Sequence, residues 1–465
     1  MTWSGAQDLR VFLADYRETY ADDVIVVDEE LASNQDVTAL VWQLAAHGHE
    51  EMLICPRVTG LGAELVTNLF ASRERIARML GTDTKGLYAA YQRGSRSLCE
   101  PRLIPYGPVL DSVTEGDSVD LATVPMIQHF QSDRAPYITG GIIFARHPDT
   151  GVGNLSYHRA MVHSRYELAT NLGSRGHLWQ MLELARGRGE LLPVAMVIGS
   201  HPKFMLAAAA STGPNLDERA IAGGFFGEPL EVVGTPRYGL GVPATAELVL
   251  EGLLDPSASV DEGPFGEYTG HSSSRSTRTL FRVQAIMRRR DAILIDVNGG
   301  NSADHLNLGR VSREAQMAEL LLERFPCVTG IHYPNSGTHF HCYVAVRPSK
   351  PGEARQVMLA ILGLDPYLKL VIAVDQDVDI RDEGQIFWAL ATHFQAHRDL
   401  FSIGGLPGNR LDPSSESDGT TSRLALDATR QVGFEGDRIE IAAAALERAA
   451  RRLDGLLSGG PTRGA

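Results

Sequence analysis

The chain has 465 residues, of which 43% are hydrophobic and 22% charged, an ordinary composition for a globular protein with room for about three domains. Its 43 Lys and Arg residues stand against 57 Asp and Glu residues, and the formal net charge of −14 disfavours nucleic acid and anionic membranes as partners. Scattered cysteines without a CxxC pair exclude a disulfide scaffold and a zinc ribbon, and together with the lack of a signal pattern or a bilayer-spanning apolar run they predict a cytoplasmic protein.

The first hundred residues alternate between helix and strand patterns. Helices are expected over residues 5–16, with Ser4 as a cap, and over 34–48 and 64–81, and strands are expected over 23–29 and 51–58. This order predicts a small α/β unit. A Pro-rich stretch between Pro101 and Pro125 is typical of a linker.

From about residue 133 to residue 298 the pattern becomes rich in strands. A hairpin is expected where segments 136–146 and 154–163 flank the turn HPDTG. Further strands are expected over 191–200, 228–234, 246–252, 279–289 and 292–299, and helices over 175–189, 203–211 and 216–224. So many strands with so few helices indicate a barrel or a sandwich.

The α/β alternation returns after Ser312. Helices are expected over 312–325, 352–363 and 382–394, strands over 338–347 and 369–375, a polar loop over 412–422 and a terminal helix over 439–457. The sequence therefore predicts a second α/β domain followed by a helix.

The segment EGPFGEYTG carries two carboxylates, Glu262 and Glu267, five positions apart. Gly263, Pro264 and Gly266 exclude a regular helix there, so a rigid turn can direct both acids at one point. Close carboxylates in different surroundings acquire different proton affinities, which suits general acid chemistry. A solvated acidic turn is the alternative.

The segment NLSYHR places Arg159 in an apolar neighbourhood, where a carboxylate or a phosphate is its natural partner. Asn154 offers an amide oxygen suited to Mg²⁺ or Mn²⁺. Their odd spacing puts the two side chains on opposite faces of a regular strand, so one shared site requires a bulge or a ligand across the strand end. A polar edge strand is the alternative.

Other polar residues allow either a site or an ordinary structural role. Arg175 and His177 stand at an expected helix start, which can bind a phosphate or simply be capped. Glu218 suits the first turn of a helix. His339 and His341 would share one strand face, but no third metal ligand of similar quality follows them. The motifs GxGxxG, GxxxxGK[ST] and GxSxG are absent, which argues against Rossmann dehydrogenases, P-loop NTPases and α/β-hydrolases.

Taken together, these segments resemble the UbiD family of prenylated-flavin-dependent decarboxylases. The resemblance covers most of the chain and rests, in order, on NLSYHR (154–159), SRGH (174–177), LDERAIAG (216–223), GVPATAELVLEG (241–252), EGPFGEYTG (262–270) and LDATR (426–430). It implies an N-terminal α/β domain over residues 1–115, a central split β-barrel similar to flavin reductases over 116–310, a C-terminal α/β domain over 311–435, and a terminal helix and tail over 436–465.

The resemblance also implies the site. Its catalytic set would be Arg159, Glu262 and Glu267, with Glu267 giving a proton to the carbon that CO₂ leaves. The cofactor would be prenylated FMN with Mn²⁺ or Mg²⁺, and often K⁺ beside it, the divalent metal being held by Asn154, His177 and Glu218. The residues implied around the cofactor are Asn154, Leu155, Ser156, Tyr157, His158, Arg159, Arg175, Gly176, His177 and Glu218.

The implied reaction is loss of CO₂ from an α,β-unsaturated acid, of acrylic or polyene type and from secondary metabolism, through a covalent adduct with the prenylated flavin. A flavin prenyltransferase would supply the cofactor, and the terminal helix suits a homodimer or a higher homo-oligomer. The alternatives are a reversible (de)carboxylase of an aromatic or heteroaromatic acid and an inactive flavin-binding homologue. Tyr268, where Met is frequent, the loop 335–339, and His393, Phe394 and His397 depart from the family pattern and are expected to shape the substrate pocket.

Overall fold

In the computed structural model, the described residues are 6–173, 176–210, 213, 215–274 and 276–458. Ser4, Ser174 and Arg175, which the sequence assigns to a helix cap and to the cofactor motif, lie outside these ranges. The residues up to Thr429 form one compact unit and those from Arg430 form a second.

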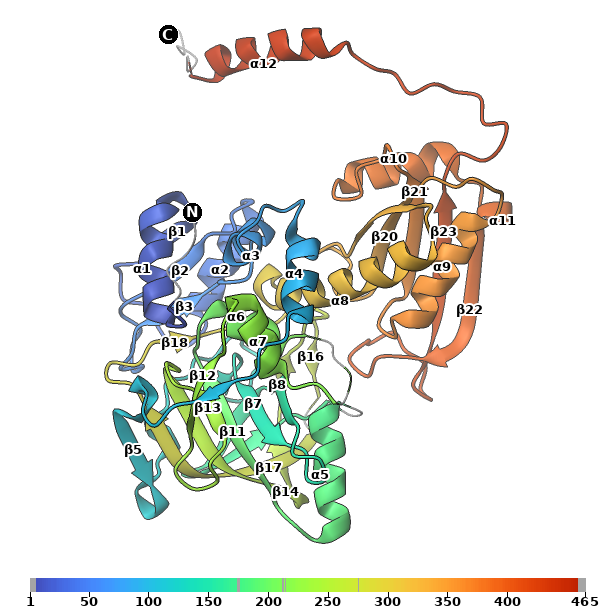
Figure 1. The fold of residues 1–465 in the computed structure, drawn as a ribbon. Helices are drawn as coiled ribbons and strands as arrows, with labels where there is room; N and C mark the ends of the chain where they lie inside the picture. Colours follow the sequence, from blue (N-terminus) through green and yellow to red (C-terminus); the bar gives the residue numbers. More distant parts are fainter. Residues whose placement is uncertain (1–5, 174–175, 211–212, 214, 275, 459–465) are drawn as a thin grey trace. The chain divides into compact units, whose positions relative to one another are not determined.

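The N-terminal part is an α/β unit built on a four-stranded sheet in the order β1–β2–β3–β18 (Figure 1). Its strands are β1 (Val24–Val26), β2 (Met52–Cys55), β3 (Leu65–Thr67) and β18 (Leu294–Ile295), and its helices are α1 (Leu9–Thr19), α2 (Asp36–Ala46), α3 (Arg73–Met79) and α4 (Leu87–Arg96). The strand β18 pairs in parallel with β3. The sequence places this strand in the central region, whereas it completes the first sheet.

The helix expected over 64–81 is wrong in its first half. The residues of β3 are all buried, and the strand pairs antiparallel with β2, so the buried sheet position outweighs helix propensity. Asn68 then takes a left-handed conformation with φ of 61°, which ends the strand. Ser72 caps α3 by accepting a hydrogen bond from the backbone N–H of Arg75.

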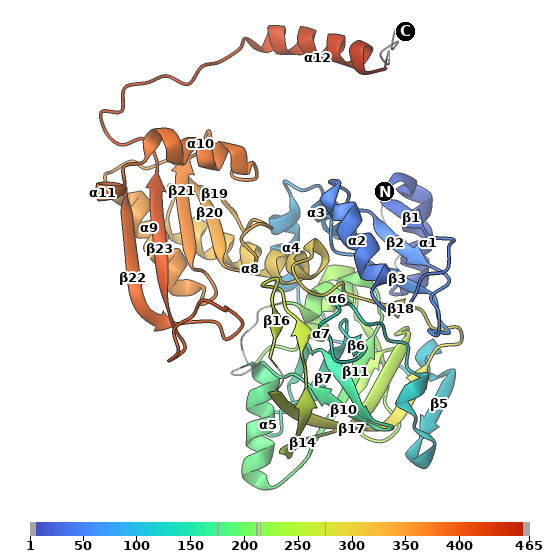
Figure 2. The ribbon, with the colours of Figure 1, turned by 180° about the vertical axis from the view of Figure 1, so that it is seen from behind.

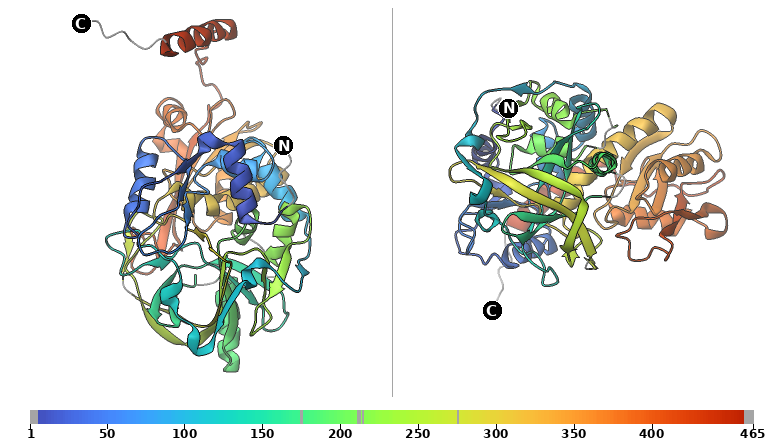
Figure 3. Two further views of the ribbon diagram at one scale, coloured as in Figure 1. Left: turned by 90° about the vertical axis from the view of Figure 1, so that its left-hand side faces the viewer. Right: turned by 90° about the horizontal axis from the view of Figure 1, so that it is seen from below.

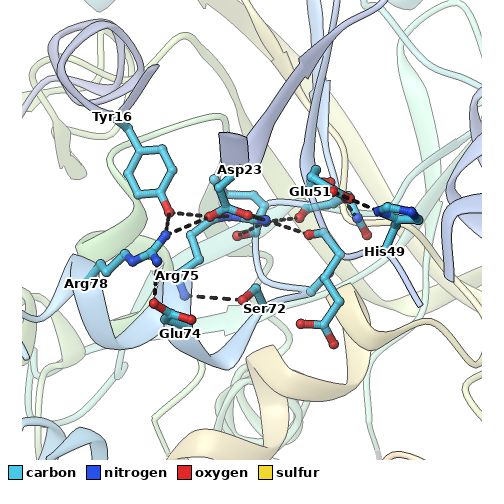
Figure 4. Close-up of polar contacts among 12 residues, drawn as sticks. Tyr16, Asp23, His49, Glu51, Ser72, Glu74, Arg75 and Arg78 are labelled. Atoms are coloured by element: carbon cyan, nitrogen blue, oxygen red, sulfur yellow. Dashed lines mark hydrogen bonds and ion pairs between the residues drawn. The ribbon is translucent and has the colours of Figure 1, made fainter. Parts of the chain in front are cut away.

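A buried ion cluster fixes α3 to the start of β1 (Figure 4). Arg75 of α3 is fully buried and donates to both carboxylate oxygens of Asp23 at 3.0 and 2.6 Å. It also donates to the carbonyl oxygens of Asn68 and Glu50 at 2.6 and 2.5 Å. Each nitrogen of the buried Arg75 guanidinium therefore has an acceptor. The same Asp23 also accepts a hydrogen bond from Tyr16, and burial together with this bond raises the pKa of Tyr16 to about 12.

The central part contains one large antiparallel sheet in the order β6–β9–β10–β17–β14–β11–β7–β8, with β5 paired to β17. Its strands are β5 (Ser112–Glu115), β6 (Tyr137–Ile138), β7 (Ile142–Arg146), β8 (Gly153–Tyr157), β9 (Ala160–Ser164), β10 (Glu167–Thr170), β11 (Leu192–Ile198), β14 (Leu248–Glu262) and β17 (Ser276–Arg288). The expected hairpin is present as β7 and β8, with Ile142 opposite Tyr157.

The large sheet curls on itself. The strands β8 and β9 lie near opposite ends of the strand order, yet Ala160 follows Tyr157 by only three positions, which is at most about 11 Å of chain. The two ends of the sheet must therefore approach each other, and the bending of the strands can be followed in Figure 3. This curvature agrees in outline with the expected barrel.

Short elements complete the central part. They are β4 (Arg102–Leu103), β12 (Glu231–Gly234) and β13 (Gly241–Pro243), which form a three-stranded sheet, the pair β15 (Phe265–Gly266) and β16 (Ser272–Ser273), and the helices α5 (His177–Arg188), α6 (Pro202–Ala208) and α7 (Glu218–Phe226). The stretch from Pro101 to Pro125, expected as a linker, thus contributes β4 and β5 to two different sheets.

The C-terminal α/β part begins with the long helix α8 (Ala303–Arg324), which starts nine positions before its expected residue because Ser302 caps it there. A five-stranded sheet follows in the order β19–β20–β21–β23–β22 (Figure 2). Its elements are β19 (Val328–His332), β20 (His341–Val346), α9 (Glu353–Leu364), β21 (Leu370–Asp375), α10 (Glu383–His393), α11 (Ala396–Asp399), β22 (Leu400–Pro407) and β23 (Thr420–Ala428).

Both faces of this sheet are covered. Val344 and Ala373 belong to a core with residues of α8 and α9, whereas their neighbours Tyr343 and Ile372 belong to a second core with residues of α10. In the second unit, helix α12 (Ala443–Ser458) begins four residues after the expected start of the terminal helix and ends one residue beyond its expected end. No helix in the described part of the chain is long and apolar enough to cross a membrane.

Candidate active site

The two predicted acids lie at the end of β14 and in the turn that follows. Glu262 is the last residue of β14 and is fully buried. Gly263, with φ of +84°, and Pro264 end the strand, so the absence of helix expected from these residues is confirmed. The N–H of Glu267 donates to the carbonyl of His271 at 2.9 Å, next to the β15–β16 pair, which fixes the second acid.

Arg159 joins the two acids. Its Nε donates to Oε1 of Glu262 at 2.8 Å, its Nη2 donates to Oε2 of Glu262 at 3.2 Å, and its Nη1 donates to Glu267. The guanidinium lies 4.4 Å from the centre of the Phe265 ring. Burial opposes the charge, but the hydrogen bonds and charges of the two carboxylates outweigh burial and raise the pKa of Arg159. The guanidinium is thus held by two acids and an aromatic face.

The odd spacing of Asn154 and Arg159 has a simple structural explanation. The strand β8 ends at Tyr157 and β9 begins at Ala160, so Arg159 lies in the break between two strands. Its carbonyl accepts a hydrogen bond from the N–H of Asn171 at 3.2 Å. The alternation of side chains between the two faces of a strand therefore ends before Arg159. Its odd spacing from Asn154 consequently does not force the two side chains onto opposite faces.

Asn154 and Glu218 form a second buried cluster between β8 and the first residue of α7. Oε2 of Glu218 accepts from the backbone N–H of Leu155 at 2.7 Å and from Nδ2 of Asn154 at 3.4 Å. Oδ1 of Asn154 is buried and accepts no hydrogen bond from any described residue. A buried amide oxygen beside a carboxylate is a suitable ligand pair for a hard divalent cation.

A cavity of about 460 Å³ connects these residues with the start of α5. Every described residue assigned to the cofactor, except Arg159, lines it: Asn154, Leu155, Ser156, Tyr157, His158, Gly176, His177 and Glu218. Gly176 is the N-cap of α5 and His177 its first residue, so the cavity is bordered by a helix start, whose first backbone N–H groups have no partner within the helix itself.

His158 contributes a neutral ring to this wall. Its Nε2 lies 2.8 Å from Oγ of Ser156 and its Nδ1 lies 3.0 Å from the carbonyl of Asn171. Burial lowers the pKa of His158 to about 4, although the bond to the carbonyl favours the charged form. The ring is therefore uncharged at neutral pH.

The far wall of the cavity is made of His305, Leu308 and Gly309 from α8, together with His339. Tyr268, which follows the second acid, is buried and its ring centre lies 4.7 Å from that of His339. Its hydroxyl has no hydrogen-bond partner among the described residues. Of the residues expected to shape the substrate pocket, Tyr268 and His339 are thus at or next to the cavity.

The remaining histidines have other surroundings. The strand β20 begins at His341, so His339 precedes it and the expected shared strand face is wrong. Among the described residues no group of three or more His, Cys, Asp and Glu side chains is arranged to hold a metal. His393 ends α10 and its Nδ1 lies 3.2 Å from the carbonyl of Ala428 in the C-terminal sheet.

One residue of the cluster was missed by the sequence analysis. Arg278 of β17 lies with its Nε 3.3 Å from Oε2 of Glu262, so two guanidinium groups share this acid. Val260 of β14 is the register partner of Arg278. Only the long-range pairing of β14 with β17 brings Arg278 beside Glu262, and no local sequence motif predicts this contact.

Family models match three consecutive parts of the chain. They are the N-terminal domain of 3-octaprenyl-4-hydroxybenzoate carboxy-lyase over residues 18–93, its Rift-related domain over 104–302 and its C-terminal domain over 306–428. These matches cover the N-terminal, central and C-terminal parts of the fold described above.

Individual relatives agree with these models. The anhydromevalonate phosphate decarboxylase of Aeropyrum pernix is 31% identical over 421 residues, which are 89% of this chain and 93% of the relative. The UbiD-class enzyme HmfF of Pelotomaculum thermopropionicum, solved with FMN, has a TM-score of 0.88 at 32% identity and covers 94% of this chain and 98% of its own.

A further structure is that of the vanillic acid decarboxylase of Sedimentibacter hydroxybenzoicus, with a TM-score of 0.83 at 25% identity, covering 98% of this chain and 99% of its own. The domain matches, the curated relative and the solved structures agree with one another over almost the whole chain. The chain belongs to the UbiD family and is a carboxy-lyase.

Proposed function

We propose that this protein is a prenylated-FMN-dependent decarboxylase of an α,β-unsaturated carboxylic acid. The observation that carries the proposal is the ion cluster in which Arg159 pairs with both Glu262 and Glu267. A non-catalytic flavin-binding protein has no need of three buried charged groups in contact. Three relatives support the proposal: two anhydromevalonate phosphate decarboxylases are about 30% identical to this chain, and an evolved form of HmfF was solved with prenylated FMN.

The residues around the cavity fit the cofactor. Oδ1 of Asn154 is buried and has no hydrogen-bond partner among the described residues. Together with Glu218 beside it and His177 on the same cavity, it would hold Mn²⁺ or Mg²⁺, with K⁺ near it. The cation would neutralise the cofactor phosphate, which the helix start at Gly176 also favours. When bound, the prenylated flavin supplies the electron sink that loss of CO₂ from an sp² carbon requires.

Each of the three residues of the ion cluster has its own role in the reaction. Arg159 orients the substrate carboxylate by presenting its guanidinium fork, and Glu262 keeps that fork in place through two hydrogen bonds. Glu267 delivers a proton to the carbon atom from which CO₂ has departed. Because Glu262 is fully buried and Glu267 nearly so, water is excluded from the acid that protonates the product.

An aromatic or heteroaromatic acid is the second candidate substrate. The rings of Tyr268, His305 and His339 are steeply inclined to one another and meet edge to face at centre distances of 4.7–6.4 Å. Aromatic side chains at or next to the cavity can contact a planar substrate ring in the same edge-to-face way. The vanillic acid decarboxylase of Sedimentibacter hydroxybenzoicus acts on an acid of this type. Anhydromevalonate phosphate and vanillic acid are therefore the first two acids to test.

The deciding experiment compares wild type and Glu267→Gln, both co-expressed with a flavin prenyltransferase. Absorbance and mass spectra measure the bound cofactor, metal analysis measures Mn²⁺, and CO₂ release measures the reaction. We expect Glu267→Gln to keep the cofactor and lose about 10²–10⁴-fold in rate, the usual contribution of a general acid. Glu323→Gln, at an exposed acid of α8, is the matched control and keeps both.

Two results would contradict the proposal. Wild type that carries prenylated FMN but decarboxylates neither acid nor a wider set of unsaturated acids would favour the inactive homologue. If the purified wild type contains neither prenylated FMN nor Mn²⁺, the assignment of Asn154, His177 and Glu218 as metal ligands is wrong. Size-exclusion chromatography of the same samples measures whether the protein is the dimer that we propose.

A further inference from the structure

Arg310 of α8 is a fully buried guanidinium with little to bind. Its Nη1 donates to Oδ1 of Asn335 at 2.5 Å and its Nη2 approaches the carbonyl of the same residue at 3.4 Å. Its Nε has no hydrogen-bond partner, and among the described residues no carboxylate lies within ion-pair distance of Arg310. In the described part of the chain, the neutral residue Asn335 is thus the only hydrogen-bond partner of this side chain.

Two other arginines with little exposed surface are neutralised. Arg75 binds Asp23 through two branches (Figure 4), and Arg313 of α8 binds Asp365 at 2.6 Å. Glu314, one turn after Arg310 on the same helix, makes no ion pair with it. Its oxygens accept from Arg73 at 2.5 and 2.9 Å instead.

The charge on Arg310 is therefore not compensated by an ion pair among the described residues, although Glu314, beyond ion-pair distance, favours the charged form. Burial, followed by the positive charge of Arg73, lowers the pKa of Arg310 to about 9 although the charge of Glu314 opposes this shift, so the group is still protonated at pH 7. A buried cation without a counter-ion destabilises a fold, and such groups persist where a ligand completes them. The sign of the missing partner is negative.

Arg310 borders two cavities of the protein only through its hydrogen-bond partner. Its partner Asn335 lines two cavities, of about 440 and 280 Å³. The larger is bordered by Gly270, three positions after Glu267, and by residues 301–303 at the start of α8. Burial, and to a smaller extent the charges of Arg310 and Arg159, lower the pKa of His305 against the effect of its hydrogen bond to the carbonyl of Gly300.

We propose that Arg310 binds a second anionic group of the substrate, a phosphate or a second carboxylate. The anion displaces the amide oxygen of Asn335 and accepts hydrogen bonds from the guanidinium fork, a geometry that suits both groups. The inference rests on the proposed function, because it places the reacting carboxylate at Arg159. It extends that function by limiting the substrates to acids with two anionic ends.

The test uses cofactor-loaded protein, so that the flavin occupies its own phosphate site. Isothermal titration with inorganic phosphate and with malonate compares wild type, Arg310→Met, Arg310→Lys and Arg381→Met. Arg381 is an exposed arginine that lines the 280 Å³ cavity, which makes it the control for general charge. We expect one equivalent of anion to bind wild type, at least tenfold weaker binding to Arg310→Met, an intermediate value for Arg310→Lys and less than twofold change in Arg381→Met.

Thermal unfolding without added anion separates this role from a structural one. Removal of an uncompensated buried charge leaves the melting temperature of Arg310→Met unchanged or higher, whereas loss of a structural ion pair lowers it. The stabilisation that phosphate or malonate gives to wild type is lost in this variant. Arg310→Lys keeps a charge at the site if the Met variant does not fold.

Kinetics provide the second test. For anhydromevalonate phosphate we expect Arg310→Met to lower kcat/KM at least 30-fold, and for the same acid without its phosphate less than threefold. Equal losses for the two acids, or wild type that binds neither anion, would overturn the inference. Arg310-dependent anion binding by a protein that releases no CO₂ would keep the anion site and reject the proposed function, so the two failures are distinguishable.

Discussion

At the scale of single residues, the site depends on charges that are buried only because each has a partner. Glu262 has no exposed surface and lies between Arg159 and Arg278. In such a cluster, removing one charged partner lowers the free energy of unfolding by more than the ion pair itself contributes to it, because the other charges remain buried and unpaired. The stability of the acidic turn and its reactivity therefore rest on the same contacts.

Glu262→Gln tests this dependence. The amide cannot neutralise two guanidinium groups, so we expect the free energy of unfolding to fall by about 3–5 kcal/mol. Urea unfolding followed by circular dichroism measures it. The exposed Glu323→Gln changes it by less than about 0.5 kcal/mol. Equal stability of Glu262→Gln and wild type would mean that the strand pairing of β14 holds the turn without the ion cluster.

At the scale of elements, α7 is positioned by close packing against α4. A Cβ on Gly224 of α7 would lie 2.1 Å from the carbonyl oxygen of Gly94 and 2.6 Å from that of Ser97. Both are backbone atoms, so no side chain can move aside. Because Glu218 is the first residue of α7, this helix contact also sets the position of one proposed metal ligand.

Gly224→Ala is therefore expected to lower the free energy of unfolding by about 1–3 kcal/mol, as overpacking does, and to reduce the cofactor retained after purification. The control is Gly187→Ala in α5. A Cβ there meets nothing within 4 Å, and the better helix former stabilises by about 0.5–1 kcal/mol. Retention is measured from the flavin absorbance. If Gly224→Ala is destabilised but retains all of its cofactor, the contact between α4 and α7 does not determine cofactor binding.

The elements that the sequence predicts well are those with a local signal. The alternation on either side of the turn HPDTG predicts the β7–β8 hairpin, and the glycines and proline after Glu262 exclude a helix. The strand β3 was predicted as helix because it is a run of only three buried residues, and β18 was assigned to the central region because its partner β3 lies far along the chain. Arg278 was missed for the same reason, since the β14–β17 register alone brings it to Glu262. The unpaired state of Arg310 likewise depends on where Glu314 points, and no motif encodes that.

At the scale of the whole molecule, buried neutral histidines make the fold sensitive to acid. Burial, and secondarily the charge of Lys203, lower the pKa of His201 to about 3, and burial lowers that of His158 to about 4. In the unfolded chain both rings take up a proton below about pH 6.5. The stability they contribute is therefore present above pH 6.5 and is lost as the pH falls toward their folded values.

His201→Asn tests the sign and the size of this effect. Nδ1 of His201 accepts from the N–H of Lys203 at 3.1 Å at the start of α6, and Asn keeps an acceptor there. Between pH 7.5 and pH 5.0 we expect wild type to lose about 2 kcal/mol more than the variant, the cost of one proton bound only by the unfolded chain. Urea unfolding at the two pH values measures the difference. An identical loss in both proteins would assign the acid sensitivity to other groups.

The late pairing of β18 with β3 has a consequence for biosynthesis. Leu65 and Val66 leave the ribosome more than two hundred residues before Leu294 and Ile295, yet the two segments are neighbours in one sheet. During that interval the nascent chain carries an apolar strand whose edge is open to other chains. The first domain to be made is thus among the last to be finished, and its unfinished edge is where a chaperone would be needed.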